Sequence, residues 1–176
     1  MHAMTRWSAR LALLVIGARG LPAQHVHEMS PYAGMVSRDI KALSEEQVAQ
    51  YQNGEGMGLA LAAELNSYPG PRHALELAGP LELTAAQHVA VSGIQVTMER
   101  DARRLGGMLV EQERKLDRAF AGGTIDDATL TAHTAVIGRL QGELRLVHLR
   151  AHIGVRRLLT PEQVQIYNRL RGYPGG

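Results

Sequence analysis

Two long stretches of this chain repeat apolar residues at helical spacing, and this pattern limits the fold more than any other feature. In the first stretch the steps are 4, 7, 4, 7 and 4 residues, which keeps the side chains on one side of a nearly straight helix. Its members are Ile94, Met98, Leu105, Leu109, Leu116 and Phe120. The second stretch steps by three or four residues. Its members are Leu130, His133, Ile137, Leu140, Leu144, Val147, Ala151, Val155 and Leu158. Only a short connection around Gly122 and Gly123 separates the two, so we expect an antiparallel pair of long helices.

Three segments carry a helix-start pattern in which serine or threonine is followed three residues later by glutamine. They are Leu43–Gln47, Leu83–Gln87 and Leu159–Gln163. In such a capping box the hydroxyl oxygen accepts a hydrogen bond from a free backbone N–H, and the glutamine side chain accepts one from the cap residue. The pattern therefore predicts a helix start in each segment. For the second long helix, we expect Thr124 to be the cap, followed by acidic residues in the first turn.

The remaining helices are expected to be short. Residues 57–67 form an apolar stretch that ends at the turn-forming residues 68–71, and a last helix should end at Gly172. Alternating β-branched runs closed by Asn-Gly or Asp-Gly are missing, which argues against strands. The chain has no cysteine, so disulfides and thiolate metal sites are excluded. We predict an all-α fold, in which a long antiparallel helical hairpin is accompanied by shorter flanking helices.

The first 23 residues have the order of a signal peptide. Arg6 and Arg10 precede the apolar run 11–16, and small or turn-forming residues lead to Ala23. The run is too short to span a bilayer, which takes roughly 20 residues. We expect cleavage after Ala23, with Gly20 as the alternative. The expected organisation is a signal peptide (1–23), an N-terminal extension with short helices (24–71) and the helical hairpin domain (72–176), in a periplasmic protein without a transmembrane segment after processing.

Removal of the signal peptide changes the charge balance. It takes three of the 19 basic residues and leaves 16 against 17 acidic ones. A nucleic-acid-binding protein needs a basic face, and neither zinc-finger spacing nor an aromatic stacking motif is present. We therefore expect no nucleic-acid partner.

The two later capping boxes also form a repeated LTxxQ signature, carried by Leu83, Thr84, Gln87, Leu159, Thr160 and Gln163. With the long helical stretches and the signal peptide, they make residues 72–172 resemble the Spy/CpxP family of periplasmic stress proteins. The resemblance implies a homodimer that acts as an ATP-independent chaperone or a stress-pathway adaptor. It also implies a branch of heavy-metal sensors and resistance proteins. The alternative is that the motifs are helix starts and nothing more.

A metal site is the second functional hypothesis. His148 and His152 lie one helical turn apart, a spacing that lets two imidazoles reach one ion. Zinc, nickel or copper would need further donors, which His25, His27 and Met29 near the mature N-terminus could supply. No cofactor is otherwise expected. The alternative is that these histidines are solvated or pack against a partner, whereas a histidine within the apolar stripe, at position 133, is expected in the core.

A chaperone needs an exposed surface on which apolar and arginine side chains alternate. The second long helix is apolar over more than one face, which makes it a candidate client or dimer surface. The candidate residues are Leu146, Leu149, Arg150, Ile153 and Arg157. The alternative is that the N-terminal extension, or a second copy of the chain, covers them permanently.

Catalysis is not expected, because nucleophile-elbow, HExxH and paired ExxH motifs are absent. The glycine-rich segment 54–58 lacks the strand and the lysine of a phosphate loop, which favours a helix-breaking turn. Two functions remain. The first is a chaperone or adaptor that binds unfolded or envelope proteins, possibly a sensor protein among them; the alternative is a heavy-metal sensor or resistance protein.

Overall fold

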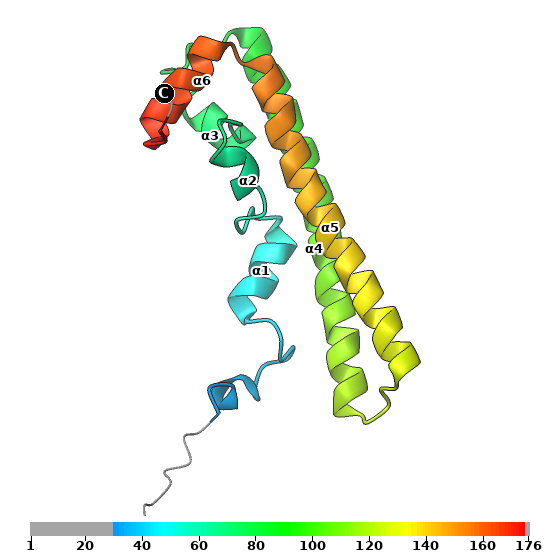
Figure 1. The fold of residues 1–176 in the computed structure, drawn as a ribbon. Coiled ribbons are helices and arrows are strands. Elements are labelled where there is room, and N and C mark those ends of the chain that lie inside the picture. Colours follow the sequence, from blue (N-terminus) through cyan, green and yellow to red (C-terminus); the bar gives the residue numbers. More distant parts are fainter. Residues whose placement is uncertain (1–29, 175–176) are drawn as a thin grey trace, which may run out of the picture. The chain divides into compact units, whose positions relative to one another are not determined.

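The computed structural model describes residues 30–174, and residues 34–174 belong to one compact unit. Within the described range the regular elements are helices and there is no strand, which confirms the predicted all-α class (Figure 1). They are a 3-10 helix at Ala33–Met35, α1 at Glu45–Asn53, α2 at Leu61–Glu64, α3 at Pro71–Glu76, α4 at Ala85–Ala121, α5 at Asp127–Leu158 and α6 at Pro161–Arg171. In this part of the chain no helix combines the length and the apolar character that crossing a membrane requires.

Helices α4 and α5 run antiparallel and pack against each other (Figure 1). The middle of their contact is a core of apolar side chains from both predicted stripes. These are Ala102, Leu105, Leu109, Ile137, Leu140 and Leu144. Phe120, the last residue of the first stripe, is 56% exposed near the turn. The periodic pattern therefore predicted the inner contact correctly, and it failed only at the end of the stripe.

The connection between α4 and α5 differs in one detail from the prediction. Asp126, not Thr124, caps α5: its carboxylate accepts a hydrogen bond from the Thr129 backbone N–H at 2.8 Å, and the Thr129 hydroxyl closes the box. Thr124 instead bonds back to the Ala119 carbonyl. The left-handed turn residue is Gly123, with φ of 63°. Aspartate competes effectively with threonine for the cap position, and this shifts the start of the helix by two residues.

The predicted capping boxes are confirmed at the starts of α1, α4 and α6. Ser44, Thr84 and Thr160 each accept a hydrogen bond from the backbone N–H three residues later, and each glutamine side chain accepts one in return. The signal was reliable because a capping box satisfies its hydrogen bonds within four consecutive residues.

Helix α1 lies directly on α4 at a glycine. A methyl group at Gly106 would collide with the Tyr51 carbonyl oxygen, so only glycine lets the two backbones approach this closely. Polar contacts hold the same segment: the Lys41 backbone N–H donates to Asp117 at 3.0 Å, and Arg103 donates to the Asn53 carbonyl at 3.2 Å. The N-terminal segment from residue 34 onward is therefore part of the same packed unit as α4 and α5.

The prediction of one apolar helix over residues 57–67 was wrong. Only Leu61–Glu64 is helical, because Met57 and Gly58 adopt left-handed backbone conformations with φ of 43° and 76°. Gly54 likewise ends α1 in a left-handed conformation, as expected of a helix-breaking turn. Helix α3 was missed, although Pro71 at its first position is a helix-start signal.

Helix α6 closes the end of the α4–α5 pair at which α4 begins (Figure 1). Its Tyr167 is fully buried in a second apolar core, which α3, α4 and α5 share. The buried members of that core are Ala74, Leu81, Val91, Val155, Leu159, Val164 and Tyr167.

Candidate functional site

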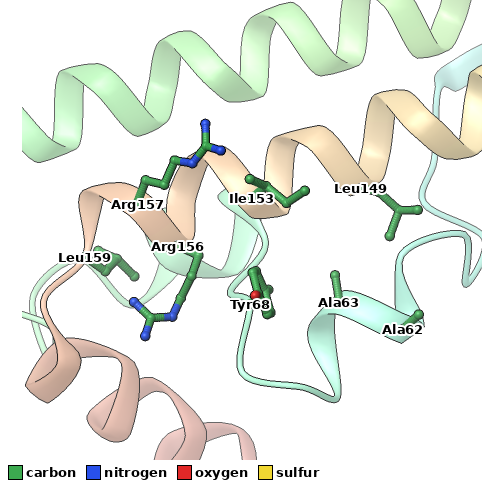
Figure 2. A pocket seen from close by; sticks show the side chains of 8 residues that line it. All are labelled: Ala62, Ala63, Tyr68, Leu149, Ile153, Arg156, Arg157 and Leu159. Atoms are coloured by element: carbon green, nitrogen blue, oxygen red, sulfur yellow. The ribbon is translucent and has the colours of Figure 1, made fainter.

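A groove lies between α5 and the segment that contains α2, and we call it the apolar groove. Its volume is about 610 Å³. It is lined by Ala62, Ala63, Tyr68, Leu149, Ile153, Arg156, Arg157 and Leu159. Figure 2 shows Leu149 and Ile153 on α5 opposite Ala63 and Tyr68. The walls are thus two short stretches that are far apart in sequence and offer mainly hydrocarbon.

The apolar groove is open to solvent and carries positive charge. Ile153 and Tyr68 are each 39% exposed. Within residues 30–174 neither Arg156 nor Arg157 forms an ion pair, so both guanidinium groups remain available. An occupant with apolar and acidic groups would complement this surface.

The structure brings together three of the five residues expected on the client or dimer surface. Leu149, Ile153 and Arg157 line the apolar groove. Leu146 lies outside it and is 42% exposed. Arg150 borders a separate depression on the α4 side of α5. The segment around α2 contacts this face of α5 but covers it only in part.

The predicted histidine pair lies in a second pocket of about 300 Å³, which we call the His–Met pocket. Both His148 and His152 line it, together with Met57 from the turn before α2 and Met98 from α4. His148 is only 3% exposed and His152 is 9% exposed. The alternative of solvated histidines is therefore wrong, because this chain itself buries them.

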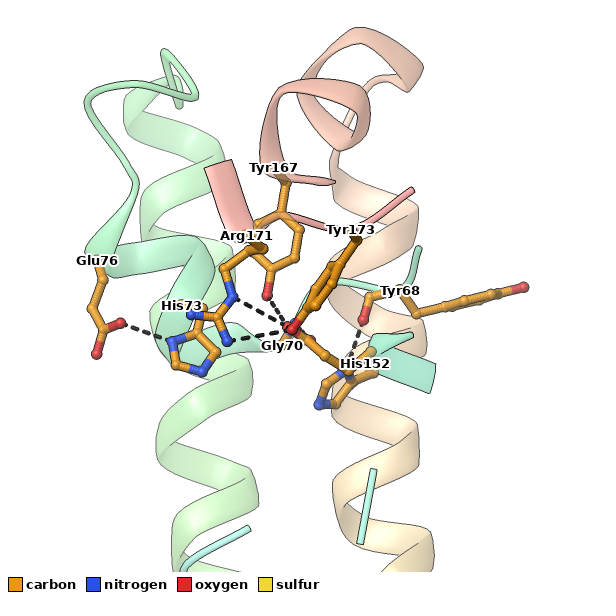
Figure 3. A network of polar contacts seen from close by, with 9 residues as sticks. Tyr68, Gly70, His73, Glu76, His152, Tyr167, Arg171 and Tyr173 are labelled. Atoms are coloured by element: carbon orange, nitrogen blue, oxygen red, sulfur yellow. Dashed lines mark hydrogen bonds and ion pairs between the residues drawn. The ribbon is translucent and has the colours of Figure 1, made fainter. Parts of the chain in front are cut away.

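Each histidine of the pair has a distinct environment. The Nε2 atom of His148 is buried and has no hydrogen-bond partner among the described residues. Burial, and secondarily the neighbouring His152, lowers the pKa of His148 below its usual value. His152 Nδ1 bonds to the Tyr68 carbonyl oxygen at 2.7 Å (Figure 3). A carbonyl can only accept, so Nδ1 carries the proton and Nε2 carries the lone pair.

Glu64 is the functional-type residue that the sequence did not reveal. This carboxylate is 8% exposed and accepts hydrogen bonds from the hydroxyls of Tyr167 at 2.6 Å and Tyr173 at 3.0 Å, and from the Gly70 N–H at 3.2 Å. Arg171 lies 3.5 Å away (Figure 3). Burial and the bond to Glu64 raise the pKa of Tyr167, which keeps its hydroxyl a donor. No local pattern marked Glu64, because its partners are more than a hundred residues away in the case of the tyrosines.

The other expected metal donors are not brought into the His–Met pocket. His25, His27 and Met29, like the predicted signal peptide, lie outside the described residues. His133 is only partly buried and bonds to Gln112 at 2.6 Å, so the expectation of a core histidine there was wrong. Between residues 30 and 174, no three histidine, aspartate or glutamate side chains converge in an arrangement suited to a metal ion.

The LTxxQ motif residues occupy one end of the unit. Gln87 and Gln163 bond to each other, Leu83 packs against the core around Tyr167, and Leu159 is buried there and also borders the apolar groove. The two motifs therefore join α4 to α6 in addition to starting these helices. Comparison of the chain with protein-family models, curated proteins and solved structures yields no match. The class that the fold defines is an all-α protein built on a long antiparallel helix pair.

Proposed function

We propose that this protein is an exported, periplasmic binding protein that acts as an ATP-independent chaperone or stress adaptor. Its ligands would be extended apolar segments of unfolded or envelope proteins, with acidic residues nearby. The observation that carries the proposal is the apolar groove, where Leu149, Ile153 and Arg157 meet the α2 segment. The LTxxQ motifs and their resemblance to the Spy/CpxP family support the same role.

The physical properties of the apolar groove suit a chain segment better than a compact substrate. Exposed aliphatic and aromatic side chains gain free energy when a partner covers them, at roughly 25 cal/mol per Å² of apolar surface. The stems of Arg156 and Arg157 extend this apolar surface, while their charged heads can pair with a carboxylate of the bound segment. The proposed role involves binding without a chemical step.

The direct test measures suppression of client aggregation in the absence of ATP. Replacement Ile153→Gln should weaken suppression severalfold, because it places a polar group in the wall of the apolar groove. The matched control is Val89→Gln on α4, an exposed position (71%) that does not line the groove. Equal activity of both variants, with helicity and thermal unfolding unchanged, would reject the groove as the client site.

The proposal includes a homodimer, in line with the Spy/CpxP resemblance. Leu146 is an apolar side chain of α5 that residues 30–174 leave 42% exposed, and a second copy of the chain could cover it. Sedimentation equilibrium of the full chain gives the mass directly. A Leu146→Gln variant should then dissociate at higher protein concentration than the unchanged protein, whereas a monomer at all concentrations would refute the dimer.

A further inference from the structure

The His–Met pocket combines two imidazoles with two thioethers, which is the donor set of a soft metal ion. His148 and His152 come from successive turns of α5, Met98 comes from α4, and Met57 comes from the turn before α2. Three separate segments thus supply side chains to one pocket of about 300 Å³. Since the chain contains no cysteine, methionine is its only sulfur donor.

His148 is placed at a free-energy cost that internal packing does not offset. Leaving a buried polar atom without a hydrogen bond costs about 1–3 kcal/mol. The Nε2 atom of His148 is in this situation, in a side chain that is 97% buried as judged from its 3% exposure. A metal ion in the His–Met pocket would give this nitrogen a partner, because neutral imidazole binds metals through its lone pair.

His152 is already oriented as a ligand. Its Nδ1–H donates to the Tyr68 carbonyl, and Glu64 Oε2 lies 3.6 Å from the same nitrogen. Histidines that bind metals commonly donate their second ring N–H to a carbonyl or a carboxylate, which fixes the tautomer. The free Nε2 faces Gly70, where even a β-carbon would lie at 3.0 Å, so the backbone leaves this nitrogen uncovered by a side chain.

The surroundings disfavour a hard or strongly charged ion. The carboxylate that borders the pocket, Glu64, is occupied by two tyrosine hydroxyls and the Gly70 N–H. Two arginines, Arg72 and Arg171, border the same pocket and add positive charge. Thioether ligands select copper in its monovalent state over zinc and nickel, and a single positive charge is also the easiest to accommodate here.

We propose that the His–Met pocket binds one copper(I) ion through the free imidazole nitrogens of His148 and His152 and the thioethers of Met57 and Met98. This site is separate from the apolar groove and does not depend on the chaperone proposal. It narrows the three metals expected from the sequence to one, and it replaces the donors expected from the N-terminal segment with methionines from the packed unit.

The test is an anaerobic titration of the full chain with copper(I) in competition with a chromogenic chelator. The expected result is one tightly bound copper(I) that depends on Met98, with at least about tenfold weaker binding in Met98→Leu. Leucine is close to methionine in volume, so this variant should fold. The matched control is Met108→Leu, at an exposed position (44%) of the same helix outside the pocket, which should bind copper(I) unchanged.

Two further measurements separate this site from other sources of binding. Copper K-edge absorption of the loaded protein should show sulfur in the first shell, and this contribution should fall in Met98→Leu and in Met57→Leu. A variant in which alanine replaces His25, His27 and Met29 should keep the Met98-dependent copper. The proposal is overturned by absence of copper(I) binding, by binding that His148→Leu and Met98→Leu leave unchanged, or by zinc binding of equal strength that does not require Met98.

Discussion

The side-chain amides of Gln87 and Gln163 donate hydrogen bonds to each other, at 2.8 and 3.1 Å. Each amide nitrogen also donates to a backbone carbonyl, that of Leu158 at 2.8 Å for Gln87 and that of Leu81 at 3.1 Å for Gln163. At the same time, each glutamine oxygen accepts the N–H of its own cap residue. The capping glutamines of α4 and α6 thus form one network, which joins residues 76 positions apart.

This network predicts that the two glutamines stabilise the protein jointly. Each of Gln87→Ala and Gln163→Ala should lower the free energy of unfolding by about 1–3 kcal/mol, since buried carbonyls lose their donors. In a double-mutant cycle monitored by urea denaturation, the coupling energy should be about 0.5–3 kcal/mol. Strictly additive losses would mean that the amide–amide contact contributes nothing beyond the two caps.

The close approach of α1 and α4 predicts opposite effects at two adjacent glycines. Gly106→Ala should lower stability by about 1–3 kcal/mol, because the added methyl group would meet the Tyr51 carbonyl and force the helices apart. Gly107→Ala is the matched control: no atom lies within 4 Å of the added carbon, so alanine should raise stability by up to about 1 kcal/mol through helix propensity. Thermal unfolding of both variants measures the difference. Similar shifts in Tm would contradict the contact.

The hydrogen bonds to Glu64 predict unequal roles for two tyrosines. Tyr167→Phe should cost about 1.5–3 kcal/mol, because the buried carboxylate loses a short hydrogen bond that water cannot replace. Tyr173→Phe should cost less, since this side chain is partly exposed and its bond is longer. Chemical denaturation of the two variants at neutral pH tests the order. A larger loss for Tyr173→Phe would show that the network is arranged differently.

The proposed client groove predicts a specific charge effect. Arg157→Gln should weaken binding of an acidic, apolar peptide severalfold and reduce its dependence on salt, because Arg157 is an unpaired cation at the groove. Arg145→Gln provides the control, as an exposed arginine of the same helix outside the groove. Fluorescence anisotropy at low and moderate ionic strength gives both affinities. Identical behaviour of the two variants would argue against charge complementarity at the groove.

Much of the helical framework was predictable because it depends on neighbouring residues. The apolar stripes of α4 and α5 and the capping boxes at Ser44, Thr84 and Thr160 act within one or two turns, and the structure confirms them. Local signals failed where two of them competed, as for Asp126 against Thr124, and around Met57, whose left-handed backbone interrupts an apolar segment.

The sequence by itself determined where the long helices lie and that His148 and His152 share one face, because helical geometry depends only on spacing. Tertiary structure alone decided that this face is buried, that Tyr68, 84 residues away, orients His152, and that Met57 and Met98 complete the pocket. It also decided that Glu64 is buried among tyrosine hydroxyls. These features arise from packing between distant segments, and a periodic pattern contains no information about which segment covers which face.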